Sequence, residues 1–486
     1  MVEIAEVIDS LDLGASVAEQ DTKLSSYFVN SRSMKSILTK KDILLGVKGS
    51  GKTAIFKQIT KNNNYSETQN VLFVDANQLN ADSDFKSAFE MMSQDDNNQN
   101  QFVQAWKIYL INAVWPKIKA LKKTESYNAL YYRVKNDKLL VDLKYPSLLD
   151  KLKFAVRRIK FAFSSDIQGN RSVETTIDLN SENELTSVKP VADLNSVDFN
   201  EIFRLIDAVL QENGKRLWIM FDRLDDAFPH EKDQFYIRQL LIAYKDFYSY
   251  DNFKLKISLR DDIFQTITGE KYGFEGLSHI SEKATTPILW DKSKFKDLII
   301  KRLKLSPQFK SYLNKKNIAI SDPEDWDAVL EVFLGKQVDN GSKNPDALGW
   351  IINHIKDGQS TATPRDVITL LNQALDMQRD EAIPNNQEPI ISSSKIKSAY
   401  EWTSNNKLTT QLYAEYPDYR SIIELFRARK STYKQRVIEQ LLGKDYEERL
   451  KQLQFVGFIG KSGDNWKVPF IYRPALEIKT GEVVKL

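Results

Sequence analysis

The stretch that most constrains the fold lies near the N-terminus. A short apolar run, Ile43–Leu45, predicts a buried strand, and it leads directly into Gly46-Val47-Lys48-Gly49-Ser50-Gly51-Lys52-Thr53. This is a complete G-x-x-x-x-G-K-[ST] phosphate loop. The residues after it, from Ala54 to Ile59, predict a helix. Strand, glycine-rich loop and helix in this order predict an α/β protein with a parallel sheet and a P-loop nucleotide-binding core.

Nine residues of this stretch are the candidate nucleotide ligands: Gly46, Val47, Lys48, Gly49, Ser50, Gly51, Lys52, Thr53 and Ala54. Glycine allows the sharp turn that brings successive N–H groups together, and the helix N-terminus adds partial positive charge. Lys52 is expected to reach the β- and γ-phosphates, and the Thr53 hydroxyl is expected to bind Mg²⁺. The alternative is a glycine-rich turn that binds nothing, a match we expect by chance roughly once in a hundred such sequences.

Composition excludes several other kinds of site. The 486-residue chain has no Cys, which rules out disulfides, thiolate zinc sites and Cys nucleophiles. Its 3 His residues lie far apart, so Mg²⁺ held by oxygen atoms is the expected metal. The net charge of +3 does not by itself favour nucleic acid as a partner. Neither a signal peptide nor a membrane-spanning run is evident, and we expect a cytoplasmic protein.

A second chemical stretch follows the apolar run 216–221. An acid at the tip of such a strand is typical of a Walker B motif, so Asp222 is the second predicted Mg²⁺ residue. The next position, where many such ATPases carry Glu, is Arg223, which cannot act as a base. Asp225 and Asp226 are the candidates for polarising the attacking water. They could instead cap a helix N-terminus, or hydrolysis could be slow and the site act as a switch.

Three other runs predict strands. Val71–Asp75 is interpreted as a central parallel strand, Phe253–Leu259 as another core strand and Thr285–Trp290 as a last short one. Ser258 and Arg260, at the end of the second run, are placed to sense a γ-phosphate or to pair with the acids of the previous strand. For Arg260, a salt bridge to Asp225 or Asp261 is the equal alternative.

Apolar 3.6-residue spacing predicts helices around 22–30, 101–123, 199–210, 231–247 and 291–303. Pro116 is expected to kink or interrupt the second of these. Residues 124–197 are interpreted as an insertion in the core, with a hairpin around 161–177. Its basic stretch 151–160 either touches a nucleic acid or acidic partner or is a solvated helix face.

The last 180 residues predict two smaller domains. Residues 307–404 form a helical lid with helices near 325–333, 348–355, 366–377 and 393–402, and Arg365 at the head of one of them can point across a cleft. Residues 405–486 show helices near 419–427, 432–442 and 446–454 and then a hairpin of 455–460 and 466–472, a winged-helix pattern. The core domain is thus 1–306. Because helix 446–454 begins with acids, the winged helix is interpreted as a structural or protein-contact module rather than a DNA reader.

The order of these parts resembles AAA+-like and STAND-like ATPases, including the origin-recognition group. It looks more closely like a bacterial family of stand-alone P-loop ATPases. Three stretches carry that likeness: the phosphate loop, the run Asp222-Arg223-Leu224-Asp225-Asp226 and the lid motif Pro364-Arg365-Asp366. The resemblance implies ATP bound by the loop, Mg²⁺ at Asp222 and a sensor role for Arg365. Relatives of this architecture act in anti-phage defence or as signalling switches.

Three functions are therefore weighed. The first is an ATP-hydrolysing molecular switch that works with a protein effector or as a homo-oligomer. The second is a DNA-binding initiator or loader ATPase that grips the DNA backbone with the winged helix and the 151–160 stretch. The third, a small-molecule phosphotransferase, is disfavoured by the long lid and the winged helix.

Overall fold

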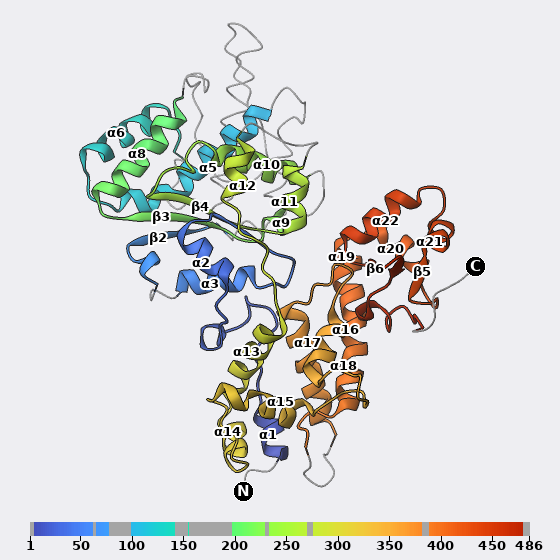
Figure 1. Cartoon of the computed structure of the whole chain (residues 1–486). Helices are drawn as coiled ribbons and strands as arrows, with labels where there is room; N and C mark the ends of the chain where they lie inside the picture. The colour runs from blue at the N-terminus through green and yellow to red at the C-terminus, as the bar shows by residue number, and fades with distance from the viewer. Residues whose placement is uncertain are drawn as a thin grey trace, which may run out of the picture. The chain divides into compact units, whose positions relative to one another are not determined.

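The computed structural model describes residues 4–61, 65–76, 99–140, 154, 197–228, 233–269, 276–381 and 388–479. The described chain has an α/β fold (Figure 1) that divides into two compact units. One unit comprises residues 1–31, 46–58 and 288–486, and the other comprises 32–45 and 59–287. The N-terminal segment thus groups with the C-terminal part of the chain. The boundaries of the three predicted domains stay a prediction.

A parallel four-stranded sheet forms the centre of the second unit. Its strands are β1 (Ile43–Leu45), β2 (Val71–Asp75), β3 (Arg216–Phe221) and β4 (Phe253–Leu259), in the order β1-β4-β3-β2. Leu45 pairs with Leu259 and Phe221 with Ile257, so the carboxyl ends of β1, β4 and β3 share one edge. Both faces are covered, as expected for a parallel sheet of continuous apolar runs.

Helices pack on both sides of this sheet. In Figure 1, α5 (Gln99–Lys119), α8 (Phe199–Glu212) and α10 (Gln234–Tyr244) lie on one side, and α2 (Arg32–Thr39) lies on the other, against β1. Helix α6 (Glu125–Asn136) packs on α8. The shorter helices of this unit are α9 (Leu224–Ala227), α11 (Asp261–Thr268) and α12 (Leu277–Glu282).

A buried ion pair joins the start of β1 to β4. Lys256 and Asp42 are each 3% exposed, with Nζ 2.8 Å from Oδ1. The Lys256 ammonium also donates to the carbonyls of Ile37 and Lys41, at 2.9 and 2.7 Å. Tyr244 donates its hydroxyl to the other Asp42 oxygen at 2.7 Å. Burial lowers the pKa of Lys256, and these bonds compensate for the loss of its water shell.

Helices make up most of the other unit. The N-terminal α1 (Ile4–Ser10) shares one apolar core with the lid region. Helix α13 (Lys292–Leu303), which the sequence assigned to the core domain, belongs to this unit rather than to the unit of the sheet. The lid helices are α14 (Pro307–Asn314), α15 (Trp326–Leu334), α16 (Ala347–Ile355), α17 (Pro364–Arg379) and α18 (Ser393–Asn406). Helix α18 continues through a π-helical segment, Lys407–Leu412, into α19 (Tyr413–Glu415). The predicted lid helices are thus present.

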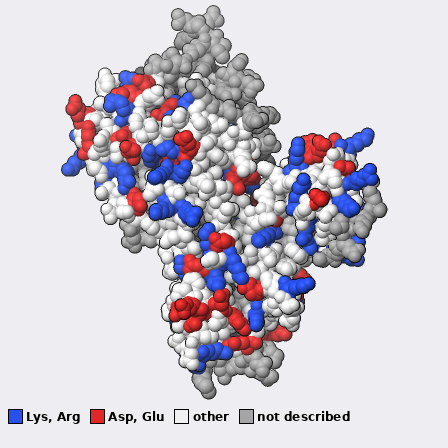
Figure 2. Space-filling model, viewed as in Figure 1, with Lys and Arg blue, Asp and Glu red and all other residues white. Residues whose placement is uncertain are grey.

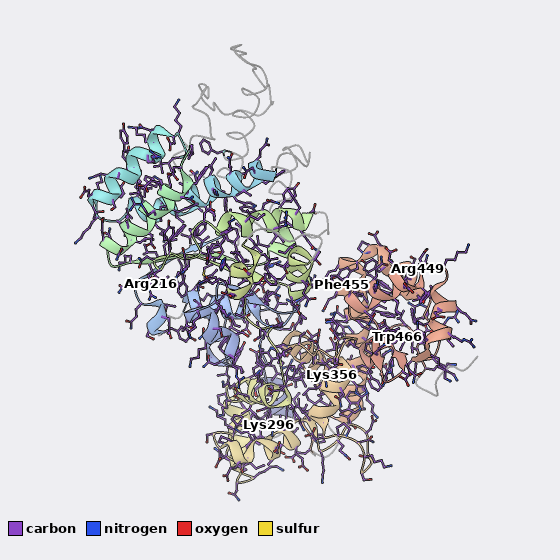
Figure 3. The ribbon with its side chains drawn as sticks, turned by 45° about the horizontal axis from the view of Figure 1, so that its top comes forward. Arg216, Lys296, Lys356, Arg449, Phe455 and Trp466 are labelled. Carbon is purple, nitrogen blue, oxygen red and sulfur yellow. The ribbon has the colours of Figure 1, made fainter. Side chains whose placement is uncertain are left out.

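The C-terminal module, residues 417–479, combines short helices with three short strands, and its assignment as a winged helix stays a prediction. After α20 (Arg420–Glu424) come β5 (Thr432–Lys434), α21 (Gln435–Leu442), α22 (Tyr446–Phe455), β6 (Gly460–Ser462) and β7 (Asn465–Lys467). The three strands form an antiparallel sheet in the order β5-β7-β6. Trp466 of β7, labelled in Figure 3, is 6% exposed. Its Nε1 donates to Gln435 Oε1 at 2.7 Å.

Several sequence predictions were wrong in the first unit. Residues 22–30 contain only a 3-10 turn, Leu24–Ser26. The Lys23 N–H donates to the Asp21 carboxylate at 3.1 Å, and this local bond competes with the backbone hydrogen bonds of a helix. In the C-terminal module, the predicted helix 432–442 begins with the strand β5, whose Tyr433 pairs with Trp466. The hairpin strands are also shorter than predicted and begin later than 455.

In the second unit, Val71–Asp75 is a parallel strand but lies last in the described sheet order rather than at its centre. Thr285–Trp290 forms no strand. The Leu45 N–H donates to the Thr285 hydroxyl at 3.0 Å rather than to a backbone carbonyl. Among the described residues, the only strand-like backbone pairing here is an isolated bridge between Ile43 and Ala284. Helix α5 contains Pro116 and ends only at Lys119, so proline does not interrupt it there. The basic stretch 151–160 and the hairpin 161–177 lie outside the described residues, Phe154 apart.

Candidate functional site

The phosphate loop has the backbone conformation that its glycines predict. Gly49 and Gly51 have φ angles of 82° and 102°, in the left-handed region that favours glycine. A Cβ on Gly51 would meet no atom within 4 Å, so this side of the loop is open. A Cβ on Gly46 would lie 2.5 Å from Ser50 Oγ, so a larger residue there would require the Ser50 hydroxyl to move. Helix α3 (Lys52–Lys61) starts at once, and the first turn of any helix offers N–H groups with no acceptor inside the helix.

Lys52 is held against the loop itself. Its Nζ donates to the carbonyls of Gly46 at 2.8 Å and Val47 at 3.1 Å. The ammonium is therefore already at the loop, as its predicted role requires. A Lys at the start of this helix is the group expected to meet the outer phosphates of a nucleotide.

Residues far away in sequence fix the loop and its helix. Trp290 Nε1 donates to the Ser50 carbonyl at 2.9 Å, and Lys57 Nζ donates to the carbonyls of Ala18 and Glu19 at 2.8 Å each. The sequence reading placed Trp290 in a strand and missed this contact, since nothing in the local pattern links it to residue 50. These bonds restrict the loop to one geometry.

The start of α17 in the lid lies beside the loop. A Cβ on Gly49 would be 3.0 Å from Thr363 Oγ1 and 3.1 Å from Arg365 Cβ, so a side chain there would crowd both. Thr363 caps α17 by accepting the Asp366 N–H at 3.2 Å. The structure therefore brings together the phosphate loop and Arg365, two features predicted from separate motifs. The sensor role of Arg365 stays a prediction.

Two polar atoms at this place are buried without a hydrogen-bond partner in the described structure. They are Arg365 Nε and Ser50 Oγ. A buried donor without an acceptor is costly and uncommon in a folded protein. An unpaired guanidinium N–H next to a phosphate loop fits an anionic ligand such as a nucleotide.

A carboxylate from the end of the lid also reaches the loop. Lys48 Nζ lies 2.7 Å from Oε1 of Glu415, the last residue of α19. Sequence reasoning missed Glu415, because the two residues are 367 positions apart and belong to no shared motif.

In the other unit, Asp222 stands at the tip of β3 as predicted. It is 3% exposed, and one of its carboxylate oxygens accepts a hydrogen bond from the Ser258 hydroxyl at the end of β4. The structure thus shows the pairing that was one alternative for Ser258. A buried carboxylate needs such partners, and a carboxylate is the kind of group that orders the water shell of Mg²⁺ in P-loop proteins.

The candidate bases lie just beyond it. Arg223 adopts a left-handed conformation with φ 57° and occupies the N-cap position of α9. Asp225 and Asp226 are therefore inside the helix, and the prediction that they could cap it is wrong. Asp225 is half-buried, whereas the side chain of Asp226 is outside the described part of the structure. Their role as the base stays a prediction.

Arg260 forms a bidentate ion pair with Asp262. Its Nε is 3.0 Å from Oδ1, and its second nitrogen is 2.6 Å from Oδ2. This partner, in the first turn of α11, is not one that the sequence suggested. A γ-phosphate sensor role for Arg260 would require it to share or leave this carboxylate, and that role stays a prediction.

The candidate residues fall into two groups by unit. The loop residues and Arg365 belong to one unit, and Asp222, Asp225, Asp226 and Arg260 belong to the other. What joins the groups is the chain itself, because β1 ends at Leu45, one residue before the loop. Its carboxyl end shares a sheet edge with the end of β3, the usual place for ligands in parallel α/β sheets.

The oxygen ligands present suit Mg²⁺. Thr53 in one unit offers a hydroxyl and Asp222 in the other a carboxylate, and both are oxygen ligands of the kind that Mg²⁺ prefers. Their joint role at one Mg²⁺ ion stays a prediction. Within the described ranges, no three His, Asp or Glu side chains gather as a self-contained metal site.

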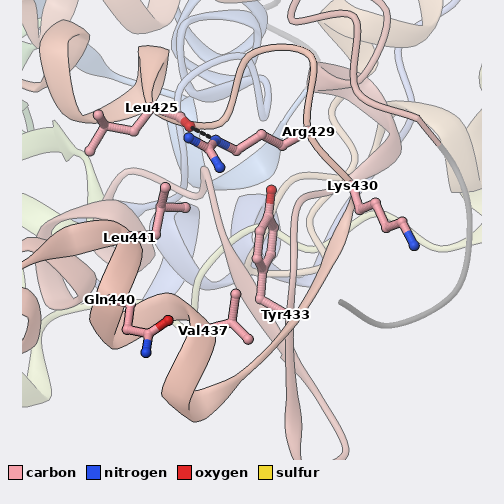
Figure 4. Close-up of a pocket in the computed structure, with 7 residues that line it drawn as sticks. All are labelled: Leu425, Arg429, Lys430, Tyr433, Val437, Gln440 and Leu441. Carbon is pink, nitrogen blue, oxygen red and sulfur yellow. Dashed lines mark hydrogen bonds between the residues drawn. The ribbon is translucent and has the colours of Figure 1, made fainter. Parts of the chain in front are cut away.

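The C-terminal module carries a second candidate site, a pocket of about 540 Å³. It is lined by Leu425, Arg429, Lys430, Tyr433, Val437, Gln440 and Leu441 (Figure 4). Arg429 Nε donates to the Leu425 carbonyl at 2.8 Å. The Tyr433 hydroxyl is buried without a hydrogen-bond partner in the described structure, and burial raises the pKa of Tyr433 to about 12. Apolar walls with two cations suit a ligand that is partly anionic.

No helix in the described parts of the chain is long and apolar enough to cross a membrane. No protein-family model matches the chain, and no curated protein matches it. Among solved structures, it is similar to the Aeropyrum pernix ORC2 protein in its ADPNP-ADP complexes, with 11% sequence identity and a TM-score of 0.43. The match covers 94% of this chain and 96% of that one. The proposals below are drawn from the residues of this chain.

Proposed function

We propose that the protein is an ATP-binding and ATP-hydrolysing molecular switch that uses Mg²⁺. The observation that carries this proposal is the complete phosphate loop between β1 and α3, with the buried and unpaired Arg365 Nε of the lid beside Gly49. A loop alone would support phosphate binding. A lid residue beside it also gives the protein a means of responding to what is bound.

Each residue has a distinct role in this proposal. Residues 46–54 bind the phosphates, with Lys52 on the outer ones, and Thr53 and Asp222 hold Mg²⁺. Bound Mg·ATP supplies the phosphoanhydride that is hydrolysed. Asp225 or Asp226 accepts a proton from the attacking water, and Arg365 stabilises negative charge on the phosphate.

Slow, regulated turnover is part of the proposal. The position after Asp222 is Arg223, a residue that cannot act as a base. An ATPase without an adjacent Glu is expected to spend long periods in one nucleotide state, which suits a switch more than a motor. The proposal includes the roles that the resemblance implies, which are signalling or anti-phage defence. In either role the protein would act on a protein effector or form a homo-oligomer.

The proposal is tested by measuring ATP hydrolysis and limited proteolysis of the purified protein. We expect slow phosphate release from ATP that stops when EDTA removes Mg²⁺, and different cleavage patterns with ATP and with ADP. Lys61→Ala, at the exposed end of α3, should behave as the wild type. An identical cleavage pattern with ATP, with ADP and without nucleotide would show that the protein is not a switch.

The second candidate function is a DNA-binding initiator or loader ATPase. The observation in its favour is that Arg429 and Lys430, at the pocket of the C-terminal module, have no carboxylate partner among the described residues. Against it, Glu447 and Glu448 lie in the first turn of α22, and Figure 2 shows acidic side chains interspersed with basic ones on the visible face of this module.

A mobility-shift assay at several salt concentrations separates the two functions. If the protein binds DNA through its phosphates, its affinity should fall steeply as the salt concentration rises. The double variant Arg429→Ala, Lys430→Ala should then bind DNA of any sequence more weakly. If DNA neither binds nor changes ATP turnover, the second function is excluded.

A further inference from the structure

The ion pair between Lys48 and Glu415 links the phosphate loop to the end of a long helix. Its two side chains are 38% and 20% exposed, and both residues belong to the same unit. Helix α18, the π-helical segment and α19 run without a break from Ser393 to Glu415. The chain then turns at Pro417–Tyr419 into α20 of the C-terminal module.

A carboxylate at the last position of a helix is unfavourable by itself. The carbonyl end of a helix carries partial negative charge, which favours Lys or Arg there rather than Glu. In this structure the Lys48 ammonium, at 2.7 Å, neutralises Glu415. The loop therefore contributes a favourable charge at this helix end.

The same helix reaches the loop by a second route. Lys407, at the start of the π-helical segment, is paired with the buried Asp366 at 2.9 Å. Asp366 accepts the Thr363 hydroxyl at 2.8 Å, and Thr363 lies beside Gly49. Two separate contacts thus connect one helix to adjacent residues of the phosphate loop. A π-helical segment between them is a place where a helix can adjust its register.

We propose that Glu415 is a positioning residue that competes with the nucleotide phosphates for Lys48. This rests on the proposed function, because it requires the loop to bind a triphosphate. With nucleotide bound, Lys48 exchanges the Glu415 carboxylate for phosphate oxygens, and the end of α19 loses its ion pair with the loop. Partly exposed ion pairs are weak, so a triphosphate can displace this one. The C-terminal module is then free to move in response to the nucleotide state.

The experiment compares Glu415→Gln, Lys48→Met and the double variant with the wild type in full-length protein. Asp339→Asn is the matched control, since it removes a carboxylate that is paired with Lys397 on the same helix but away from the loop. Calorimetry gives the affinity for Mg·ATP, and hydrogen exchange of the amides of residues 413–425 is measured without nucleotide.

Glu415→Gln should bind Mg·ATP about two- to fivefold more tightly, because the competing carboxylate is gone. Both single variants should raise hydrogen exchange at 413–425 without nucleotide. In the Lys48→Met background, Glu415→Gln should have no further effect on affinity. Asp339→Asn should leave affinity and exchange in this segment unchanged.

Three results would overturn the inference. Wild-type affinity together with wild-type exchange in Glu415→Gln would show that the pair controls nothing. A gain in affinity that persists without Lys48 would mean that Glu415 simply repels the nucleotide. If the wild type binds no Mg·ATP, the proposed function fails first and the inference with it. If the wild type binds Mg·ATP and Lys52→Ala does not, the proposed function stands. Either of the first two results then rejects only the inference about Glu415.

Discussion

Lys256 is a buried charged residue in the core of the sheet unit. The cost of removing its ammonium from water must be compensated by hydrogen-bond and ion-pair partners. Its ammonium has three oxygen acceptors within 2.9 Å and lies 4.6 Å from the centre of the Trp218 ring. The cluster ties the end of α2 and the start of β1 to β4. It therefore fixes the strand from which the phosphate loop emerges.

Removing one member of this cluster should be strongly destabilising. We predict that Lys256→Met lowers the free energy of unfolding by about 3–5 kcal/mol, because Asp42 stays buried and keeps only the more distant Lys283 ammonium, at 3.8 Å, as a cationic partner. Denaturant unfolding measures it. Asp42→Asn should cost a similar amount, and the double variant should lose clearly less than the sum of the two. Additive losses would contradict a shared cluster.

The identity of the base is a second question at the scale of residues. Asp225→Asn and Asp226→Asn remove one candidate each while keeping the size of the side chain. If one of them is the general base, its variant should lose about 10²- to 10⁴-fold in turnover with ATP still bound. Single-turnover hydrolysis under saturating ATP measures the loss. Normal turnover in both variants would rule out both acids.

At the scale of elements, helix α16 carries a half-buried histidine in its last turn. His354 stacks on Trp350 at 3.6 Å between ring centres, and its Nδ1 donates to the Trp350 carbonyl at 2.8 Å. Burial, mainly, lowers the pKa of His354 below its ordinary value of 6.5. The imidazole is thus neutral in the folded lid.

This makes lid stability depend on pH in a defined direction. Below pH 6.5 the unfolded chain takes up a proton that folded His354 resists, so the free energy of unfolding falls as pH drops through 6.5. We predict a lower denaturation midpoint at about pH 5.5 than at about pH 7.5. His354→Gln should reduce this difference, whereas His279→Gln, at an exposed position, should not. An unchanged pH dependence in His354→Gln would contradict the assignment.

The elements that sequence could predict are those with local signals. Helices α13 and α17 have capping side chains, Asp291 and Thr363, and apolar spacing, and both are present close to their predicted bounds. The C-terminal strands were misplaced because each is three residues long and depends on pairing with segments far along the chain. At Thr285, the side-chain hydroxyl accepts the Leu45 N–H that a backbone carbonyl would accept in a strand. No propensity pattern in the sequence predicts this substitution.

The same division applies to the candidate site. The loop and Asp222 belong to local motifs, so sequence places them on the correct elements. The contacts of Trp290 and Glu415 with the loop are tertiary, spanning 240 and 367 positions. No spacing rule connects residues that far apart, and only the fold brings them to the loop.

At the scale of the whole molecule, the candidate residues are distributed over two units. The loop, the lid and the C-terminal module belong to one, and the acids at the sheet edge belong to the other. The proposal of a switch rests on the first of these units, where Arg365 of the lid lies beside Gly49 of the phosphate loop.

The most direct test of the central claim is a calorimetric titration of Mg·ATP into the wild type and Lys52→Ala. Lys52 is the residue whose ammonium already lies on the loop carbonyls of Gly46 and Val47. The account predicts saturable binding by the wild type and no measurable binding by a folded Lys52→Ala protein. Equal affinity in the two proteins would contradict it.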